Sequence, residues 1–294
     1  MFNLFAKRRK EVRPITTLDR HEAIRTAYRL LGKELSQEAV EVMDKSLAAY
    51  KSDFDLVCAL LFSHEGLDVF MSRAIDLHLT FIHNARLKMV RRLIPAGDTI
   101  LDLGGANAPL YDLGYPHSFS KMTLIDLPLE DRHQDFQVAL RDTGGKVYVR
   151  YEDMTELKGI ESGSVDLVWS GQSIEHVSPE KGANMCREAY RVLKPGGHFC
   201  LDTPNRLITE LHAATVGGGF VHPDHKIEYT PAQLRQVLQE AGFTVAHEWG
   251  LCEMPLTAKS RVFNYDDFIV GGSISTNIDD CYIQFFDCVK PGNA

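Results

Sequence analysis

The stretch that decides the fold is Thr99-Ile100-Leu101-Asp102-Leu103-Gly104-Gly105-Ala106-Asn107-Ala108-Pro109, in which a short apolar strand breaks abruptly into small residues. Glycine and alanine permit a tight turn into a helix, and they let a ligand lie against the backbone. About one strand–helix unit downstream, a second apolar strand, residues 122–125, ends in Asp126. A carboxylate in that position can accept hydrogen bonds from both hydroxyls of a ribose. The two strand ends together predict a site for a nucleoside-bearing cofactor.

The composition narrows the class of protein. A chain of 294 residues can form one large α/β domain and a smaller companion. Its net charge of -8 argues against a broad phosphate-binding surface, so we expect no nucleic-acid partner. The six cysteines contain no CxxC pair, which indicates neither a zinc site nor a disulfide framework and fits a cytoplasmic protein. No apolar run approaches the length of a membrane span, so we expect no integral membrane association.

The periodicity of apolar residues changes along the chain. Residues 20 to about 92 show helical spacing only, whereas from Asp98 onward strand and helix patterns alternate. We therefore predict a small helical N-terminal domain, residues 1–90, and an α/β domain, residues 91–294. In the second domain we expect a mostly parallel sheet of seven strands, at residues 99–103, 122–125, 147–150, 165–170, 198–202, 244–247 and 282–288.

Two signals concern the segments between these strands. Thr230-Pro231-Ala232-Gln233 combines a helix cap, a proline at the first helical position and a capping-box glutamine, which predicts a helix running to Gly242. Residues 203–229 and 249–280 show no clear period. Long irregular segments in a compact α/β domain are typical of substrate-facing loops, and we predict that role for both.

Several motifs of the second domain resemble one known family. Residues 98–248 contain, in order, Asp102-Leu103-Gly104-Gly105, Asp126, Glu152-Asp153-Met154, Val165-Asp166-Leu167-Val168-Trp169-Ser170 and Leu193-Lys194-Pro195-Gly196-Gly197. This order and spacing resemble class I methyltransferases that depend on S-adenosylmethionine. The resemblance implies a Rossmann-like fold, methyl transfer, and S-adenosylmethionine as cofactor. A nicotinamide-dependent oxidoreductase is the rival interpretation, but the first loop lacks the third glycine of its GxGxxG motif.

Each matching position has a physical reason to contact this cofactor. Backbone N–H groups at the mouth of a helix attract the methionine carboxylate, and Asp102 can accept from the ammonium group or brace the loop. Asp126 suits the ribose, or alternatively caps a helix. Asp153 can accept from the adenine amino group with Met154 on the ring, or can be a solvated turn residue. The predicted cofactor-binding residues are Asp102, Gly104, Gly105, Asn107, Asp126, Leu127, Asp153, Met154 and Ser170.

Three histidines are candidates for a catalytic base. A hydroxyl acceptor benefits from a base with a pKa near neutrality, which favours histidine. His176 follows the fourth predicted strand, and His222 and His225 lie in the segment 220–229. Any of the three can serve as the base. The alternative is that His176 packs on its helix and that the other two are surface groups.

A metal-assisted mechanism is a further alternative. Gln172, Glu175 and His176 share one helical face, and with His222 or His225 they resemble the divalent-metal cluster of methyltransferases that act on RNA ribose ends or catechols. Those families have glutamate where this chain has Gln172. Because a neutral amide holds a hard cation less tightly than a carboxylate, we expect no metal.

The acceptor is inferred from weaker resemblances. Residues 21–35 and 59–65 resemble a helical domain joined to bacterial enzymes of surface polysaccharide, and residues 113–117 with 125–128 resemble methyltransferases found beside sugar-processing enzymes. These resemblances imply O-methylation of a sugar hydroxyl in a surface glycan or its precursor, and a protein partner for the helical domain. The alternatives are a small phenol, lipid or quinone-like acceptor, and a scaffold that binds the cofactor without turnover.

Overall fold

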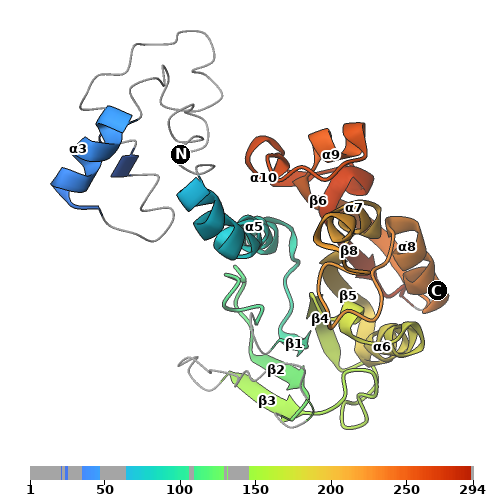
Figure 1. The fold of residues 1–294 in the computed structure, drawn as a ribbon. Helices are drawn as coiled ribbons and strands as arrows, with labels where there is room; N and C mark the ends of the chain where they lie inside the picture. The colour runs from blue at the N-terminus through green and yellow to red at the C-terminus, as the bar shows by residue number, and fades with distance from the viewer. Residues whose placement is uncertain are drawn as a thin grey trace. The chain divides into compact units, whose positions relative to one another are not determined.

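The computed structural model describes residues 21, 24–25, 35–46, 64–105, 109–128, 131 and 146–292. The predicted cofactor residue Asn107 lies outside them. The chain divides into two compact units, Met1–Leu79 and Thr80–Ala294, and the division falls within helix α5 (His64–Leu93) (Figure 1). The domain boundary expected after residue 90 stays a prediction.

The first unit contains helix α3 (Gln37–Ser46), as its helical periodicity predicts. Val40 of this helix and Ile24 are fully buried. Polar contacts join the ends of the unit's described segments: Arg25 donates a hydrogen bond to Gln37, and His21 Nε2 lies 3.3 Å from a carboxylate oxygen of Asp44.

The second unit is built on one sheet of eight strands. They are β1 (Thr99–Leu103), β2 (Lys121–Asp126), β3 (Val147–Tyr151), β4 (Val165–Gly171), β5 (Leu193–Pro204), β6 (Thr244–Glu253), β7 (Ile274–Ser275) and β8 (Cys281–Val289). Their order in the sheet is β3-β2-β1-β4-β5-β8-β6-β7. Neighbouring strands from β3 through β5 are parallel, whereas β8 is antiparallel to both β5 and β6. The Rossmann-like, mostly parallel sheet is therefore confirmed.

The strand count differs from the seven that the sequence predicts. The additional strand, β7, has two residues and pairs antiparallel with Gly250 and Leu251 of β6 at the edge of the sheet. A two-residue strand shows no period along the sequence, because one alternation of inward and outward side chains needs more residues than that. Only its pairing with β6 identifies it.

Helices cover both faces of the sheet (Figure 1). On one face lies α5, whose buried residues recur at positions 82, 85, 86, 89 and 90, the spacing of an amphipathic helix. On the other face lie α6 (Pro179–Val192) and α8 (Pro231–Glu240). β1 contributes to both cores, since Ile100 packs with the α5 side and Leu101 and Leu103 pack with the α6 side. A strand buried on both faces needs such a continuous apolar run.

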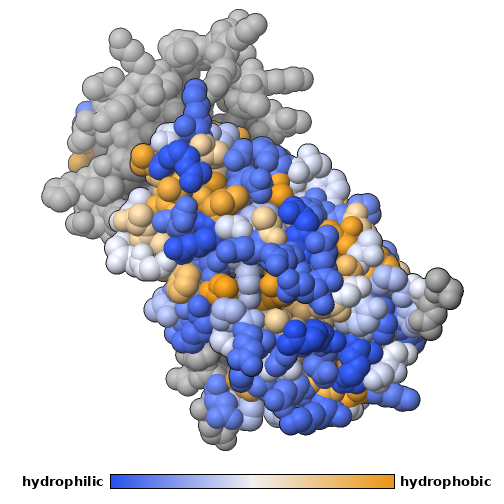
Figure 2. Space-filling view, turned by 90° about the vertical axis from the view of Figure 1, so that its right-hand side faces the viewer, coloured by the Kyte–Doolittle hydropathy of each residue, from blue (hydrophilic) through white to orange (hydrophobic). Residues whose placement is uncertain are grey.

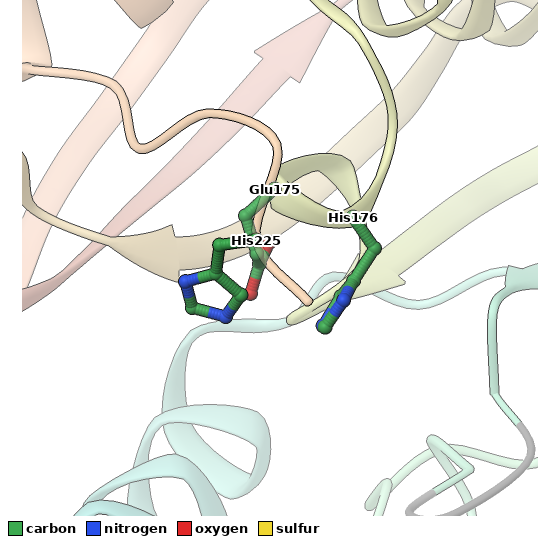
Figure 3. A group of neighbouring side chains, drawn as sticks. All are labelled: Glu175, His176 and His225. Atoms are coloured by element: carbon green, nitrogen blue, oxygen red, sulfur yellow. The ribbon is translucent and has the colours of Figure 1, made fainter. Parts of the chain in front are cut away.

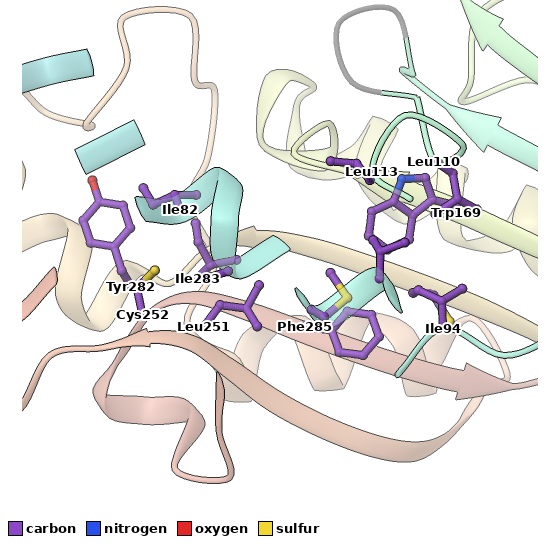
Figure 4. Packing of buried hydrophobic residues seen from close by; sticks show 14 of the residues in the cluster. Ile82, Ile94, Leu110, Leu113, Trp169, Leu251, Cys252, Tyr282, Ile283 and Phe285 are labelled. Carbon is purple, nitrogen blue, oxygen red and sulfur yellow. The ribbon is translucent and has the colours of Figure 1, made fainter. Parts of the chain in front are cut away.

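The core beneath α5 extends from the helix to the far end of the sheet. Figure 4 shows Trp169 of β4 between Leu110 and Leu113 at one end of this cluster and Tyr282 of β8 beside Ile82 at the other. On the face drawn in Figure 2, hydrophilic residues predominate and hydrophobic ones occur in scattered groups. No helix among the described residues is long and apolar enough to cross a bilayer.

The two segments expected to be irregular contain regular structure. Helix α7 (Arg206–Val216) occupies the first, with Asn205 accepting a hydrogen bond from Leu207 N–H at its start and Gly217 in the left-handed region at its end. These caps are recognisable in the sequence. The second segment holds α9 (Pro255–Ser260), α10 (Asp267–Val270), β7 and the 3₁₀ turn η4 (Ile278–Asp280).

Distant contacts explain why the short helices of the second segment escape detection. The carboxylate of Asp267 accepts hydrogen bonds from the backbone N–H groups of Leu256 and Thr257, each at 2.8 Å, and so caps α9 from outside that helix. A helix of one or two turns is unstable by itself and depends on such contacts. The prediction for residues 230–242 is confirmed, since Thr230 and Gln233 form the reciprocal capping box at the start of α8.

Candidate active site

The loop after β1 is closely packed at Gly104 and Gly105, where a side chain would collide with its neighbours. Gly104 has φ +74°, and its N–H donates to the carbonyl of Ile125 at 2.8 Å, which ties the loop to β2. A Cβ added to Gly104 would lie 2.4 Å from Ser173 Oγ, and one added to Gly105 would lie 2.6 Å from the Asp102 carboxylate. Both distances are too short for real atoms. These two predicted glycines therefore permit a turn that no larger residue can form.

Asp102 is the most unusual carboxylate beside this loop. Its side chain is fully buried, and one oxygen accepts from Leu110 N–H at 2.6 Å. The other oxygen has no hydrogen-bond partner among the described residues. Burial raises the pKa of Asp102 to about 7, although the Leu110 N–H and the Arg86 charge act in the opposite direction. Asp102 thus braces the loop with one oxygen and has the other available to an ammonium group.

Ser170 adds a second unpartnered polar atom at the same edge. It pairs in register with Leu103 at the carboxyl end of β4, and its buried hydroxyl finds no partner among the described residues. Buried polar groups are almost always hydrogen-bonded in native proteins. Two such groups at the ends of adjacent parallel strands, next to the turn Gly104-Gly105, fit a polar ligand such as S-adenosylmethionine.

The ends of β2 and β3 place the remaining predicted cofactor residues. Asp126 accepts from Leu127 N–H at 2.8 Å. One oxygen of Asp153 accepts from the N–H and hydroxyl of Thr155, and the other accepts from Lys181 at 3.1 Å. Although burial raises the pKa of Asp153, these hydrogen bonds outweigh it and lower the pKa. Asp153 therefore stabilises a turn, and its contact with the adenine amino group stays a prediction.

Met154 completes this side of the loop. Its sulfur lies 3.8 Å from the position that a Cβ on Gly104 would occupy, so the side chain borders the glycine turn. The structure thus brings the predicted cofactor residues to the carboxyl edge of the sheet. Asp102, Gly104 and Gly105 lie at the end of β1, Asp126 and Leu127 at the end of β2, Ser170 at the end of β4, and Asp153 and Met154 two and three residues beyond β3. This is the edge at which ligands bind in open α/β sheets.

The three predicted histidines lie together. His176 ends the 3₁₀ turn η3 (Ile174–His176) that follows β4, whereas His222 and His225 belong to the segment between α7 and α8. The ring of His176 is 5.0 Å from that of His225 and 5.9 Å from that of His222, measured between centroids. Lys226 and Ile227 hold the two segments together by donating to the carbonyl of Glu175.

Glu175 stands beside the histidines (Figure 3). It is buried and accepts from the hydroxyl of Thr203 at 2.8 Å. Burial raises its pKa to about 7, although His225 and Thr203 act in the opposite direction. Glu175, His176 and His225 each offer one donor atom, and the three atoms lie within 4.8 Å of one another. That spacing would admit a cation.

Gln172 does not belong to this group. Its φ is +54°, its N–H donates to the carbonyl of Asp202, and its side-chain amide donates to the Asp202 carboxylate at 3.1 Å. The same carboxylate accepts from Arg86 of α5 at 2.6 and 3.2 Å. Residues 172 and 176 are therefore directed to different partners, contrary to the shared face that the i, i+4 spacing suggests, because the 3₁₀ turn η3 begins only at Ile174.

The Arg86–Asp202 ion pair is a part of the site that the sequence did not indicate. Both side chains are buried, and the pair joins the helix before β1 to the carboxyl end of β5. An arginine in the apolar stripe of α5 was a usable signal, since charged residues are almost never buried without a partner. No feature of the sequence indicated that the partner is Asp202, 116 positions away.

The comparisons with known proteins agree with this geometry. Residues 77–248 match a protein family described as a methyltransferase domain. The chain belongs to this methyltransferase family. It is an enzyme whose cofactor is S-adenosylmethionine, and the two buried polar atoms and the glycine turn at the carboxyl edge are compatible with this ligand.

Individual relatives are more distant. A protein of Mycolicibacterium smegmatis named as an S-adenosylmethionine-dependent methyltransferase is 35% identical over 106 residues, which are 36% of this chain and 38% of that protein. A ubiquinone biosynthesis O-methyltransferase of Xanthomonas axonopodis is 28% identical over 189 residues, 62% of this chain and 77% of the relative. A solved methyltransferase from Thermotoga maritima shares the fold, with a TM-score of 0.52 at 16% identity over 78% of this chain and 96% of that one.

These matches leave some predictions untouched. The family match begins at residue 77, so the resemblance of the N-terminal helices to a domain of surface-polysaccharide enzymes stays a prediction. The individual roles of the cofactor and histidine residues also rest on their chemistry and placement alone.

Proposed function

We propose that this methyltransferase transfers the methyl group of S-adenosylmethionine to a hydroxyl of a small aromatic, quinone-like acceptor. The observation that supports an oxygen acceptor is the cluster of His176, His222 and His225 beside Glu175. Histidine can remove a hydroxyl proton at neutral pH, a step that methylation of an already nucleophilic amine does not need in the same way. The similarity to ubiquinone biosynthesis O-methyltransferases supports an aromatic acceptor.

The histidine cluster is joined to the cofactor loop through the side chain of Ser173. Ser173 lies at the start of η3, and its hydroxyl donates to the carbonyls of Leu103 and Gly171, each at 3.1 Å. His176 is therefore three residues from a side chain that contacts the cofactor turn. This connection supports a single site in which one part holds the cofactor and the other receives the acceptor hydroxyl.

Different residues of the chain bind the cofactor and remove the acceptor proton. When bound, S-adenosylmethionine supplies an electrophilic methyl group. The unpartnered oxygen of Asp102 accepts from the ammonium group of the ligand, and Asp126 accepts from its ribose. The glycine turn leaves room for the ligand against the backbone. The histidine cluster orients the acceptor hydroxyl and takes its proton, and alignment of the reacting groups provides much of the acceleration.

The remaining parts of the proposal concern the acceptor, a protein partner and the location of the protein. A sugar hydroxyl, the acceptor expected first, and a protein partner for the N-terminal helices stay predictions. A cytoplasmic location agrees with the five free thiols in the described part of the chain, all of them buried, which need no oxidising compartment.

The experiment that tests the function is an acceptor screen in two steps. Calorimetric titration with S-adenosylhomocysteine comes first, with NAD as the control ligand, and micromolar binding of the former alone is expected. The protein is then incubated with S-adenosylmethionine and either catechol-type phenols or free and nucleotide-linked sugars, and methylated products are measured by mass spectrometry.

The outcomes separate the acceptor classes. Methylation of phenols but not of sugars supports the proposal, whereas methylation of sugars alone contradicts it in favour of the glycan prediction. Binding of the cofactor product without turnover on any acceptor would support the scaffold alternative. Parallel reactions with EDTA, and with EDTA followed by Mg²⁺, show whether a metal takes part.

A further inference from the structure

Glu228 has an unusually complete set of partners next to the histidine cluster. Its side chain is fully buried in the segment before α8. One oxygen contacts His225 Nδ1 at 2.7 Å and accepts from Val221 N–H at 3.1 Å. The other accepts from the hydroxyl of Thr209 at 2.5 Å and lies 3.6 Å from Arg206. Two elements, α7 and the segment 220–229, thus cooperate to hold one carboxylate against one histidine.

We propose that His225 is the catalytic base of the methyl transfer and that Glu228 is the positioning residue that fixes its tautomer and orientation. This inference rests on the proposed function, because it names the proton acceptor for an O–H substrate. It distinguishes His225 from His222, two histidines that the sequence treats as equivalent. It also assigns a role to Glu228, which no feature of the sequence singles out.

The protonation states follow from the contacts. Although burial raises the pKa of Glu228, the hydrogen bonds from His225, Thr209 and Val221 outweigh burial and lower it, so the carboxylate is ionised at neutral pH. An ionised carboxylate can only accept, so Nδ1 of His225 must carry a proton. In the neutral ring Nε2 then has the free lone pair. Figure 3 shows the His225 ring beside Glu175 and facing His176.

The transfer balances with this assignment. The acceptor oxygen forms a bond to the methyl carbon, the electrons of the broken carbon–sulfur bond go to sulfur, and the hydroxyl proton goes to Nε2 of His225. The resulting imidazolium is stabilised by the buried negative charge of Glu228. The same logic, in which a carboxylate orients a histidine and stabilises its protonated form, operates in catalytic triads.

The geometry of His222 argues against it as the base. Its Nδ1 accepts a hydrogen bond from Asp224 N–H at 3.2 Å, which places the proton of the neutral ring on Nε2. Its only carboxylate neighbour, within the part of the chain that the structure describes, is Asp224 at 3.9 Å. Burial and the nearby His225 lower the pKa of His222. His222 therefore lacks both the buried anion and the free ring nitrogen that His225 has.

Several titratable or charged groups lie near His225, so the pH dependence of activity must be compared between variants. Glu228 and His222 belong to its own segment, Glu175 and His176 belong to η3, and Arg206 of α7 reaches Glu228. Glu175 itself titrates near pH 7. A pH profile of the wild type alone therefore reports a mixture of groups, and the effect of Glu228 must be obtained as a difference between variants.

The test compares Glu228→Gln with Glu210→Gln in the full chain. Both changes replace a glutamate that approaches Arg206, but Glu210 is exposed and contacts no histidine among the described residues. We expect Glu228→Gln to lower kcat on the best phenol by roughly 100-fold or more, the size of a general-base contribution, with little change in the affinity for S-adenosylhomocysteine. The acidic limb of its kcat profile should move to lower pH, because the imidazolium loses its counter-charge. Glu210→Gln should change neither quantity, and Glu228→Asp should recover part of the loss.

A second measurement does not depend on turnover. Nitrogen-15 NMR of the histidines, with the His225 signals assigned through His225→Gln, should show the Nδ1–H tautomer in the wild-type protein and its loss or mixing in Glu228→Gln. If Glu228→Gln does not fold, Glu228→Asp and Thr209→Val replace it in both measurements. Thr209→Val retains the carboxylate and removes one of its donors.

The possible results separate this inference from the proposed function. If no phenol is methylated but NMR shows the Nδ1–H tautomer, the proposed acceptor fails and the Glu228–His225 geometry stands. Unchanged kcat and pH profile in Glu228→Gln, or an Nε2–H tautomer of His225, overturns the inference. Activity that EDTA abolishes and Mg²⁺ restores also overturns it, since His225 would then be a ligand and not a base.

Discussion

We predict that Asp102→Asn weakens cofactor binding and makes the free energy of unfolding less sensitive to pH. The buried Asp102 carboxyl has a pKa of about 7, against an ordinary value of 3.8. The folded protein therefore retains a proton that the unfolded chain releases. As pH rises from about 4 to about 7, the wild type loses stability through this group, and above pH 7 the loss is complete.

The magnitude follows from the shift. Each unit of pKa difference corresponds to about 1.4 kcal/mol, so the whole shift amounts to about 4 kcal/mol, of which about 2.3 kcal/mol falls between pH 5 and pH 7. Asparagine has nearly the same shape and can still accept from Leu110 N–H. Its buried NH₂ group costs about 1 to 3 kcal/mol at every pH, and this cost does not change the slope.

The assay is urea unfolding of both proteins at several pH values between 5 and 8, followed by the fluorescence of the buried Trp169. The free energy of unfolding of Asp102→Asn, relative to the wild type, should rise by about 2 to 3 kcal/mol across this range. Glu175, whose pKa is also about 7, titrates in both proteins, so its contribution cancels in the difference. A difference that is independent of pH would refute the assignment of a raised pKa to Asp102.

Cofactor binding supplies the second half of this prediction. If the unpartnered oxygen of Asp102 accepts from the ligand's ammonium group, Asp102→Asn should bind S-adenosylhomocysteine roughly 10- to 100-fold more weakly, the value of a charge-assisted hydrogen bond. Wild-type affinity should increase as Asp102 ionises toward pH 8, and the variant should lack that increase. Equal affinity at all pH values would leave Asp102 with only its bracing role.

Three further substitutions probe the remaining contacts. Asp126→Ala should weaken S-adenosylhomocysteine binding by on the order of 1 to 3 kcal/mol in calorimetry, through the loss of ribose hydrogen bonds, and unchanged affinity in a folded variant would exclude this role. Gly104→Ala should lower the melting temperature, with a cost of about 1 to 3 kcal/mol, because the new Cβ meets Ser173 at a positive φ; a melting temperature like that of the wild type would contradict the strained turn. Arg86→Met should destabilise the protein by about 3 to 5 kcal/mol in urea unfolding because it leaves the Asp202 charge buried alone, whereas the double variant with Asp202→Asn should recover much of the loss.

The fold was largely predictable because its signals are local. The apolar run of β1, the glycines after it and the capping box at Thr230 each constrain a few neighbouring backbone angles, and the structure confirms all three. The short elements between residues 249 and 280 were not predictable. They are stabilised by distant partners such as Asp267, and a helix of four to six residues carries too little periodicity of its own.

The candidate site was predictable in part for the same reason. Strand ends and small residues identified the cofactor edge, and residue type alone identified histidines as bases. Local sequence did not reveal that the Asp153 carboxylate accepts hydrogen bonds from Thr155 and Lys181, or that the Gln172 side chain donates to Asp202. Spacing along a chain predicts a shared face only while the helix continues, and η3 is too short for that.

The amino-acid sequence by itself determined the seven longer strands, the places where the chain turns tightly and the residue types at the strand ends, since these depend on backbone sterics and on the burial of neighbouring side chains. The tertiary structure decided which groups meet. The pairing of Glu228 with Thr209, of Glu175 with Thr203, and of Arg86 with Asp202 joins elements that are separate in the chain. These contacts set the charges and proton positions of the site, because the state of a buried group depends on its neighbours in space.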